Sequence, residues 1–207
     1  MINIDETEKR FESEYDIFIS YRRLNSQGQI EGRDIARLLA KELKLHGYSV
    51  FFDYSEIKDG DFDRVILPAV RSCVVFLLIL TPDSLTRCSN EGDWVTREIL
   101  EAKRGNSKII TVDPSYSFTS FPDDLPQDLN FIKTIQRSSI DMESNFEITV
   151  EKMVRERIRP FLPGVSIPHE DNGGSPFVIL KFGERLIELP DVFFNKHVYS
   201  ALKRSYE

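Results

Sequence analysis

A tryptophan and a glutamate lie four residues apart in a segment that carries the signals of a helix. Trp94 and Glu98 belong to Asp93–Gly105, which starts with an acid and ends with two bases followed by a glycine. Residues at i and i+4 share one helical face, so the indole and the carboxylate would lie about one turn apart. In a crevice, this carboxylate could bind sugar hydroxyls and stabilise a nearby cation, while the indole could stack on a heterocycle. The alternatives are a core tryptophan with an exposed glutamate, and a site that uses Glu91 as its acid.

Two adjacent arginines, Arg22 and Arg23, follow Tyr15–Ser20, a short apolar segment rich in β-forming residues. Two neighbouring guanidinium groups cannot both point into a core. One interpretation is an anion or phosphate clamp, because the planar guanidinium offers a fork of donors. The other is a solvated pair, or one arginine bonded to a nearby carboxylate.

The polar segment Asp53–Asp61 carries four acids and includes Asp59-Gly60 near its end. This composition predicts a loop, either a mobile flap that recognises a ligand or partner, or a solvated acidic turn. The spacing of its acids does not match a calcium-binding EF-hand loop.

Several common enzyme signatures are missing from the chain. It contains no dinucleotide-binding glycine motif, no P-loop and no nucleophile elbow. The three histidines are scattered, and Cys73 and Cys88 lack metal-ligand spacing, so the sequence predicts neither a metal nor a cofactor. Cys73 opens an apolar segment and is expected to be inert packing, whereas Cys88 lies in a loop without any sign of a nucleophile.

Composition narrows the class of protein further. The 207 residues correspond to about 1.4 domains of ordinary size. The net charge of −7 argues against a nucleic-acid partner, because proteins that grip phosphates usually carry a basic face. The longest apolar run, Cys73–Leu80, is too short for a membrane span, and the charged N-terminal segment is not a secretory signal. With only two cysteines, the chain is expected to be cytoplasmic.

Strands and helices alternate along the first three quarters of the chain. Strands are expected at Tyr15–Ser20, Tyr48–Phe52, Val74–Leu80, Lys108–Val112 and Phe131–Ile135, and helices at Arg33–His46, Phe62–Ser72, Asp93–Gly105 and Phe146–Phe161. Because proline lacks an amide donor, the fourth strand should end before Pro114. The alternation predicts an α/β fold with a parallel sheet flanked by helices, whose ligand crevice lies at the carboxyl ends of the strands.

The chain divides into four parts. Residues 1–13 form an N-terminal extension, residues 14–161 the α/β domain, and residues 162–176 a linker rich in proline and glycine. Residues 177–207 form an appendage with a β-hairpin, in which Phe177–Phe182 and Arg185–Leu189 flank a two-residue turn. The alternative is that the appendage is the start of a truncated domain.

Four segments in this order resemble a TIR (Toll/interleukin-1 receptor) domain: Tyr15–Arg23 (YDIFISYRR), Leu43–Asp53 (LKLHGYSVFFD), Leu78–Cys88 (LILTPDSLTRC) and Asp93–Ile99 (DWVTREI). The resemblance covers Glu14 to Phe161 and implies a flavodoxin-like sheet of five parallel strands. The last segment resembles the NAD-cleaving branch, which includes bacterial antiphage (Thoeris-type) TIR proteins and the animal axon-degeneration NADase.

Membership of that branch implies a site for NAD⁺ as substrate. Glu98 would be the catalytic carboxylate, Trp94 would stack on an aromatic ring, and Arg22 or Arg23 would hold the diphosphate. Further contacts implied by the resemblance are Tyr21 and Asp53, with a flexible loop that includes Tyr54, Glu56, Lys58, Gly60 and Phe62. The loop Leu24–Gly32 is longer than the family pattern, so Arg33 or this loop could share the phosphate role.

The resemblance also implies a reaction, partners and a setting. After nicotinamide leaves, the ADP-ribosyl group would pass to water, to an internal acceptor or to another molecule, giving ADP-ribose, a cyclic isomer or a conjugate. Such enzymes self-associate, complete their site with a neighbour's loop, and supply a signal to a downstream effector in antiphage defence. The competing interpretations are a TIR scaffold without catalysis, for which the pair Trp94 and Glu98 has no use, and a host-directed virulence effector.

Overall fold

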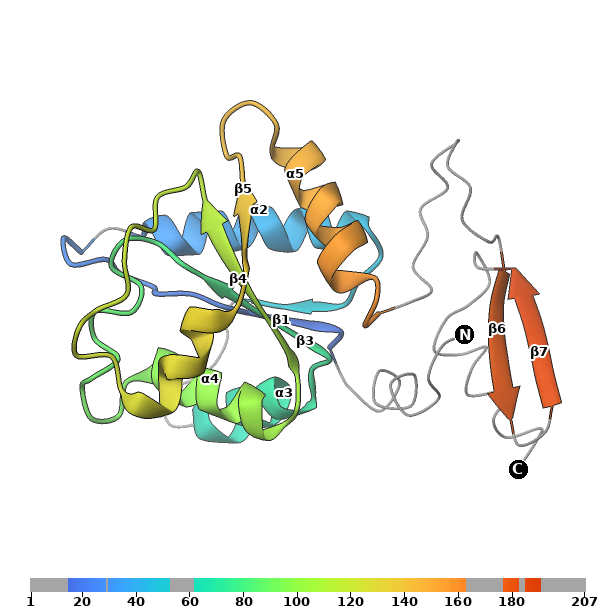
Figure 1. Cartoon of the computed structure of the whole chain (residues 1–207), viewed down its shortest axis with the longest axis horizontal. Helices are drawn as coiled ribbons and strands as arrows, with labels where there is room; N and C mark the ends of the chain where they lie inside the picture. Colours follow the sequence, from blue (N-terminus) through green and yellow to red (C-terminus); the bar gives the residue numbers. More distant parts are fainter. Residues whose placement is uncertain (1–14, 29, 53–61, 163–176, 183–184, 191–207) are drawn as a thin grey trace.

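The computed structural model describes residues 15–28, 30–52, 62–162, 177–182 and 185–190. Five parallel strands form one sheet in the order β2-β1-β3-β4-β5 (Figure 1). The strands are β1 (Ile17–Ser20), β2 (Val50–Phe51), β3 (Val75–Ile79), β4 (Lys108–Pro114) and β5 (Arg137–Ile140). The helices are α2 (Glu31–Leu45), α3 (Phe62–Ser72), α4 (Trp94–Arg104) and α5 (Phe146–Met153), with a 3-10 helix η1 (Gln127–Thr134) and a π-helical turn η2 (Val154–Ile158). The predicted flavodoxin-like fold is confirmed.

Helices cover both faces of the sheet. Helices α2 and α5 lie on one face, and α3 and α4 lie on the other (Figure 1). Successive side chains of a strand point to opposite faces, so Ile17 and Ile19 of β1 join the cluster under α2 and α5, whereas Phe18 joins the cluster under α3 and α4. Ser20 therefore falls on the α3 and α4 side as well.

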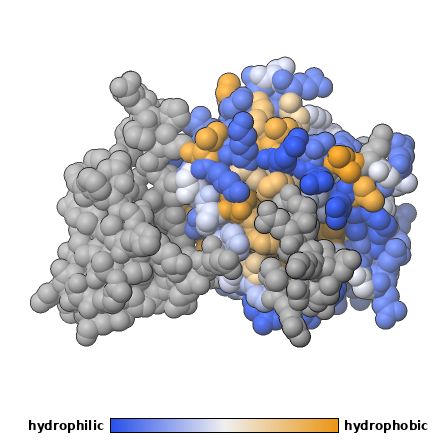
Figure 2. Space-filling view, turned by 180° about the vertical axis from the view of Figure 1, so that it is seen from behind, coloured by the Kyte–Doolittle hydropathy of each residue, from blue (hydrophilic) through white to orange (hydrophobic). Residues whose placement is uncertain are grey.

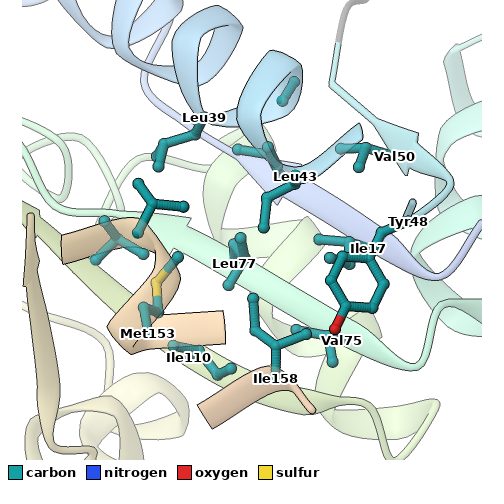
Figure 3. Packing of buried hydrophobic residues seen from close by; sticks show 14 of the residues in the cluster. Ile17, Leu39, Leu43, Tyr48, Val50, Val75, Leu77, Ile110, Met153 and Ile158 are labelled. Atoms are coloured by element: carbon teal, nitrogen blue, oxygen red, sulfur yellow. The ribbon is translucent and has the colours of Figure 1, made fainter. Parts of the chain in front are cut away.

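Figure 3 shows the cluster under α2 and α5. Leu39 and Leu43, four residues apart on α2, are fully buried and pack toward Leu77 of the central strand β3. Burying a side chain of this size stabilises the fold by about 1.5–3 kcal/mol. Because both faces of β1 and β3 are buried in this way, the carboxyl end of β1 has a fixed position in the sheet.

The helix that carries Trp94 and Glu98 has well-defined ends. The Asp93 carboxylate accepts a hydrogen bond from the Thr96 backbone N–H at 2.9 Å, which makes Asp93 the N-cap of α4. Gly105 ends the helix, and a Cβ atom at this position would meet the Arg71 carbonyl oxygen at 2.3 Å. Glycine is therefore required there for the close approach of α3 and α4.

The predicted fifth strand at Phe131–Ile135 is wrong. These residues fall in η1 and just after it, and the fifth strand is Arg137–Ile140. The buried residues Leu129 and Ile132 are three apart, which suits a 3-10 helix with three residues per turn. The true strand (RSSI) is an edge strand that is largely polar, so its sequence lacks the apolar pattern of a buried strand. The fourth strand, predicted as Lys108–Val112, runs two residues further and includes Pro114, which pairs with Ile140 at the end of the ladder.

Two further predictions concern the ends of the domain. The final helix, expected at Phe146–Phe161, is α5 continued by the wider turn η2. The two strands of the predicted hairpin are present as the antiparallel strands β6 (Phe177–Phe182) and β7 (Arg185–Pro190), in which Phe182 pairs with Arg185. The division of the chain into four parts stays a prediction. Within the described part of the chain, no helix is long and apolar enough to span a bilayer.

Candidate active site

A cavity of about 290 Å³ opens beside the carboxyl end of β1. It is lined by Tyr21–Leu24 after β1, Ile66 of α3, Arg87 after β3, and Trp94, Val95 and Glu98 of α4. In the observed strand order, β1 is flanked by β2 and β3, so the chain after β1 lies where the direction of winding changes. Open α/β sheets bind their ligands at such a switch point, which makes this cavity the candidate site.

Glu98 lies in the cavity wall with only 3% of its surface exposed. Its Oε2 accepts a hydrogen bond from the Ser20 hydroxyl at 2.5 Å, although the two residues are 78 positions apart in the chain. The sequence interpretation did not identify Ser20 as a partner of Glu98. The signal that could have revealed it is a serine at the carboxyl end of a strand whose three preceding residues are apolar.

Arg22 is buried and firmly paired. Its guanidinium donates to both carboxylate oxygens of Asp93, at 2.5 and 3.2 Å, and its Nε donates to the Ser84 carbonyl oxygen at 2.9 Å. A bidentate pair of this kind is strong and geometrically specific. The arrangement corresponds to the alternative that one arginine bonds to a nearby carboxylate.

Asp93 is the acid at the centre of this arrangement. Burial by itself would raise the pKa of Asp93, but hydrogen bonds from Arg22 and from the Thr96 N–H outweigh it and hold the pKa below its ordinary value. The same carboxylate therefore caps α4 and neutralises Arg22, so it links the segment after β1 to the start of the helix that carries Glu98.

Arg23 differs from its neighbour because it is exposed and lines the cavity. The loop that follows it is attached to the segment after β3. The Arg87 guanidinium donates to the Leu24 carbonyl oxygen at 2.5 Å, and the Ser26 hydroxyl donates to Asp83 at 2.6 Å. These contacts, which sequence reasoning missed, give the long loop a defined place at the rim of the cavity.

Two aromatic residues belong to the same cavity wall. Trp94 is half-buried, and the Arg97 guanidinium lies over its ring at 4.3 Å from the centroid. Tyr21 is buried, with 4% of its surface exposed, and also lines the cavity. The structure therefore brings Tyr21, Arg23, Trp94 and Glu98 together, as required of a common site.

The remaining predicted site residues lie mostly outside the described part of the chain. Asp53, Tyr54, Glu56, Lys58 and Gly60 are among them, and Phe62 is the first residue of α3. Across the described residues, no group of three or more histidines, cysteines or acids is arranged to hold a metal ion.

The Cys88 thiol lies next to the arginine pair but is shielded from solvent, with 2% of the residue exposed. Burial raises the pKa of Cys88 to about 11. Cys88 packs in the hydrophobic cluster under α3 and α4, as expected of a buried thiol.

Comparison with known proteins identifies the family. The NAD(+) hydrolase sarm1 of Drosophila melanogaster is 35% identical over 171 residues, which cover 76% of this chain and 12% of the fly protein. The NAD(+) hydrolase SARM1 of Danio rerio is 31% identical over 162 residues, which cover 76% of this chain and 21% of the fish protein. The chain thus corresponds to a small part of each relative.

A family model assigns the chain to a class, and a solved structure can be aligned with it. The TIR domains of the activated Roq1 resistosome align with a TM-score of 0.47 and 13% identity, over 69% of this chain and 98% of that one. The family model described as TIR domain matches residues 17–154, the span from β1 to the start of η2. The chain therefore belongs to the TIR domain family.

Proposed function

We propose that this TIR domain cleaves NAD⁺ at the bond between nicotinamide and ribose. The observation that carries the proposal is the buried carboxylate of Glu98 in the wall of a cavity that also contains Trp94 and Arg23. The names of the relatives, NAD(+) hydrolases of fly and fish, support the same substrate.

The proposed chemistry is a glycosyl transfer. As the C–N bond breaks, its electron pair leaves with nicotinamide, whose ring nitrogen becomes neutral, and the anomeric carbon gains oxocarbenium character. The Glu98 carboxylate hydrogen-bonds the ribose hydroxyls and stabilises the positive charge that develops on the ring. A carboxylate in a site with little water is more effective in this role than an exposed one, because solvent does not screen it.

Three neighbours hold the substrate in this proposal. Arg23, which is exposed at the cavity, binds the diphosphate, because Arg22 is already committed to Asp93. Trp94 stacks on an aromatic ring of the substrate, and Tyr21 forms part of the wall. Asp53 and the loop from Tyr54 to Phe62 stay predicted contacts.

The test compares Glu98→Gln with Glu91→Gln, an exposed glutamate on the loop just before α4. Nicotinamide release from NAD⁺ should fall by about 10²- to 10³-fold in the first variant, the scale expected when an electrostatic stabiliser is removed, and stay unchanged in the second. In the same assay, Arg23→Ala should raise KM more than it lowers kcat. Full activity in Glu98→Gln would contradict the assignment, and no release by the wild type at high protein concentration would favour the scaffold.

The acceptor, the assembly and the cofactor requirement are also proposals. Water would give ADP-ribose, an internal nucleophile a cyclic isomer, and a second molecule a conjugate, so mass spectrometry of the product distinguishes the three.

We propose no metal or cofactor, so EDTA should leave the rate unchanged. Self-association is supported by the exposed side chains of Leu38 and Leu45, which lie two turns apart on α2.

The proposed biological role is a nucleotide signal in antiphage defence, read by a downstream effector. Phage plating on cells that express the wild type or Glu98→Gln tests this role. Equal plaque counts on the two kinds of cells would contradict the role in antiphage defence. The alternative role as a host-directed effector would then be the one to test.

A further inference from the structure

The hydrogen bond between Ser20 and Glu98 joins the central part of the sheet to the proposed catalytic carboxylate. We propose that Ser20 is a positioning residue, whose hydroxyl holds the Glu98 carboxylate in the orientation that faces the bound ribose. This inference rests on the proposed function and adds a residue to the same site.

Ser20 is held in place by the central strand β3 and by the core around it. It is the last residue of β1 and pairs with Leu78 of β3, whereas the ladder between β1 and β2 ends at Phe18. Ser20 is fully buried, and strand alternation directs its side chain toward α4. The hydroxyl is therefore a donor whose position does not depend on any loop.

Glu98 needs such a donor. A carboxylate with 3% exposure loses most of its hydration, and this loss is costly unless hydrogen bonds replace it. The distance of 2.5 Å to the Ser20 hydroxyl is typical of a hydroxyl that donates to a charged carboxylate. A glutamate also has three rotatable side-chain bonds, so a fixed donor reduces the number of orientations that the carboxylate can adopt.

A second buried glutamate on the same helix shows a different arrangement. Glu101 is equally buried, at 3%, but it pairs with the guanidinium groups of Arg71 and Arg104. Those cations offset its negative charge. The Ser20 hydroxyl is a neutral donor, so it orients the Glu98 carboxylate without adding a charge of its own.

The experiment measures kcat and KM for nicotinamide release by the full chain. Ser20→Ala removes the donor, and Ser20→Cys replaces it with a weak donor of similar size. Both variants should lower kcat by about tenfold and change KM by less than about twofold, because the orientation of Glu98 matters most in the transition state. The matched control is Ser84→Ala: Ser84 is also fully buried, but its hydroxyl donates to the Thr81 carbonyl oxygen at 2.8 Å. This control should keep both parameters within about twofold of the wild type.

The outcomes separate this inference from the proposed function. If Glu98→Gln loses activity but both Ser20 variants keep the wild-type kcat, the positioning role is overturned and the proposed function stands. If Glu98→Gln keeps its activity, both proposals fall. A rise in KM alone, or an equal loss of kcat in Ser84→Ala, also overturns the positioning role. If Ser20→Ala does not fold, the measurement on Ser20→Cys decides.

Discussion

Two adjacent arginines after the end of β1 lie in different environments. Arg22 is 8% exposed and bonds to Asp93, whereas Arg23 is exposed at the cavity. Removing one partner of a buried ion pair is strongly destabilising, since the other charge is left without compensation. The pair between Arg22 and Asp93 thus acts on the site through the position of α4.

Asp93→Asn tests this pair at neutral pH. An asparagine still caps the helix, but it leaves the Arg22 charge unpaired, so the free energy of unfolding should fall by about 3 kcal/mol. The control is Asp83→Asn, which removes a carboxylate near the surface that accepts two hydrogen bonds from Ser26. Urea unfolding should show a loss of less than about 1 kcal/mol for the control.

The pH dependence of this difference follows from the direction of the pKa shift. The pKa of Asp93 in the folded protein lies below its ordinary value of 3.8, because hydrogen bonds from Arg22 and Thr96 outweigh burial. The stability advantage of the wild type over Asp93→Asn should be complete above about pH 5, and should be lost as the pH falls below 3.8 through the folded pKa. An advantage that persists undiminished at the lowest pH would show that the carboxylate charge is not its source.

At the scale of the elements, α2 rests directly on the backbone that leads into the site. A Cβ atom at Gly32, in the first turn of α2, would lie 2.4 Å from the Arg22 carbonyl oxygen. This contact is with backbone and not with a flexible side chain, so the helix and the segment after β1 cannot both keep their positions when the atom is added.

Gly32→Ala should therefore destabilise the protein by about 1–3 kcal/mol. The sign of this change in stability is informative. In an unconstrained helix, alanine is more stable than glycine by about 1 kcal/mol, so the substitution would otherwise stabilise the protein. Leu38→Ala, on the exposed side of the same helix, is the control and should change stability little. A thermal melt that places Gly32→Ala above the wild type would contradict the close approach.

At the scale of the molecule, both hydrophobic clusters are built from residues between Ile17 and Leu162. The surface of this domain shows hydrophobic patches among hydrophilic ones on the face opposite to that of Figure 1 (Figure 2). Because each face of the sheet has its own cluster, the domain contains the apolar packing that a cooperative fold needs.

Removal of residues 163–207 should therefore leave a cooperative thermal transition with a midpoint within about 5 °C of the full chain. Circular dichroism measures the transition, and light scattering on the same samples measures the mass. Loss of cooperative melting would show that the segment with β6 and β7 is part of the folded core. A smaller number of chains per particle, with intact melting, would assign self-association to that segment.

The sequence by itself determined most of the elements. Helix α3 has the predicted bounds, and α4 starts and ends where its cap and glycine indicated, because capping residues and apolar periodicity act within a few residues. The fifth strand could not be predicted, because its stability comes from pairing with β4 and not from its own polar sequence.

The tertiary structure decided the partners within the site. Sequence predicted that Arg22, Arg23, Trp94 and Glu98 lie near one crevice, since strand ends converge at one edge of a parallel sheet. It could not show that Arg22 bonds to Asp93 across 71 residues, or that Glu98 bonds to Ser20 across 78. A hydrogen bond depends on distances of a few tenths of an ångström, and only the packed positions of β1 and α4 define those distances.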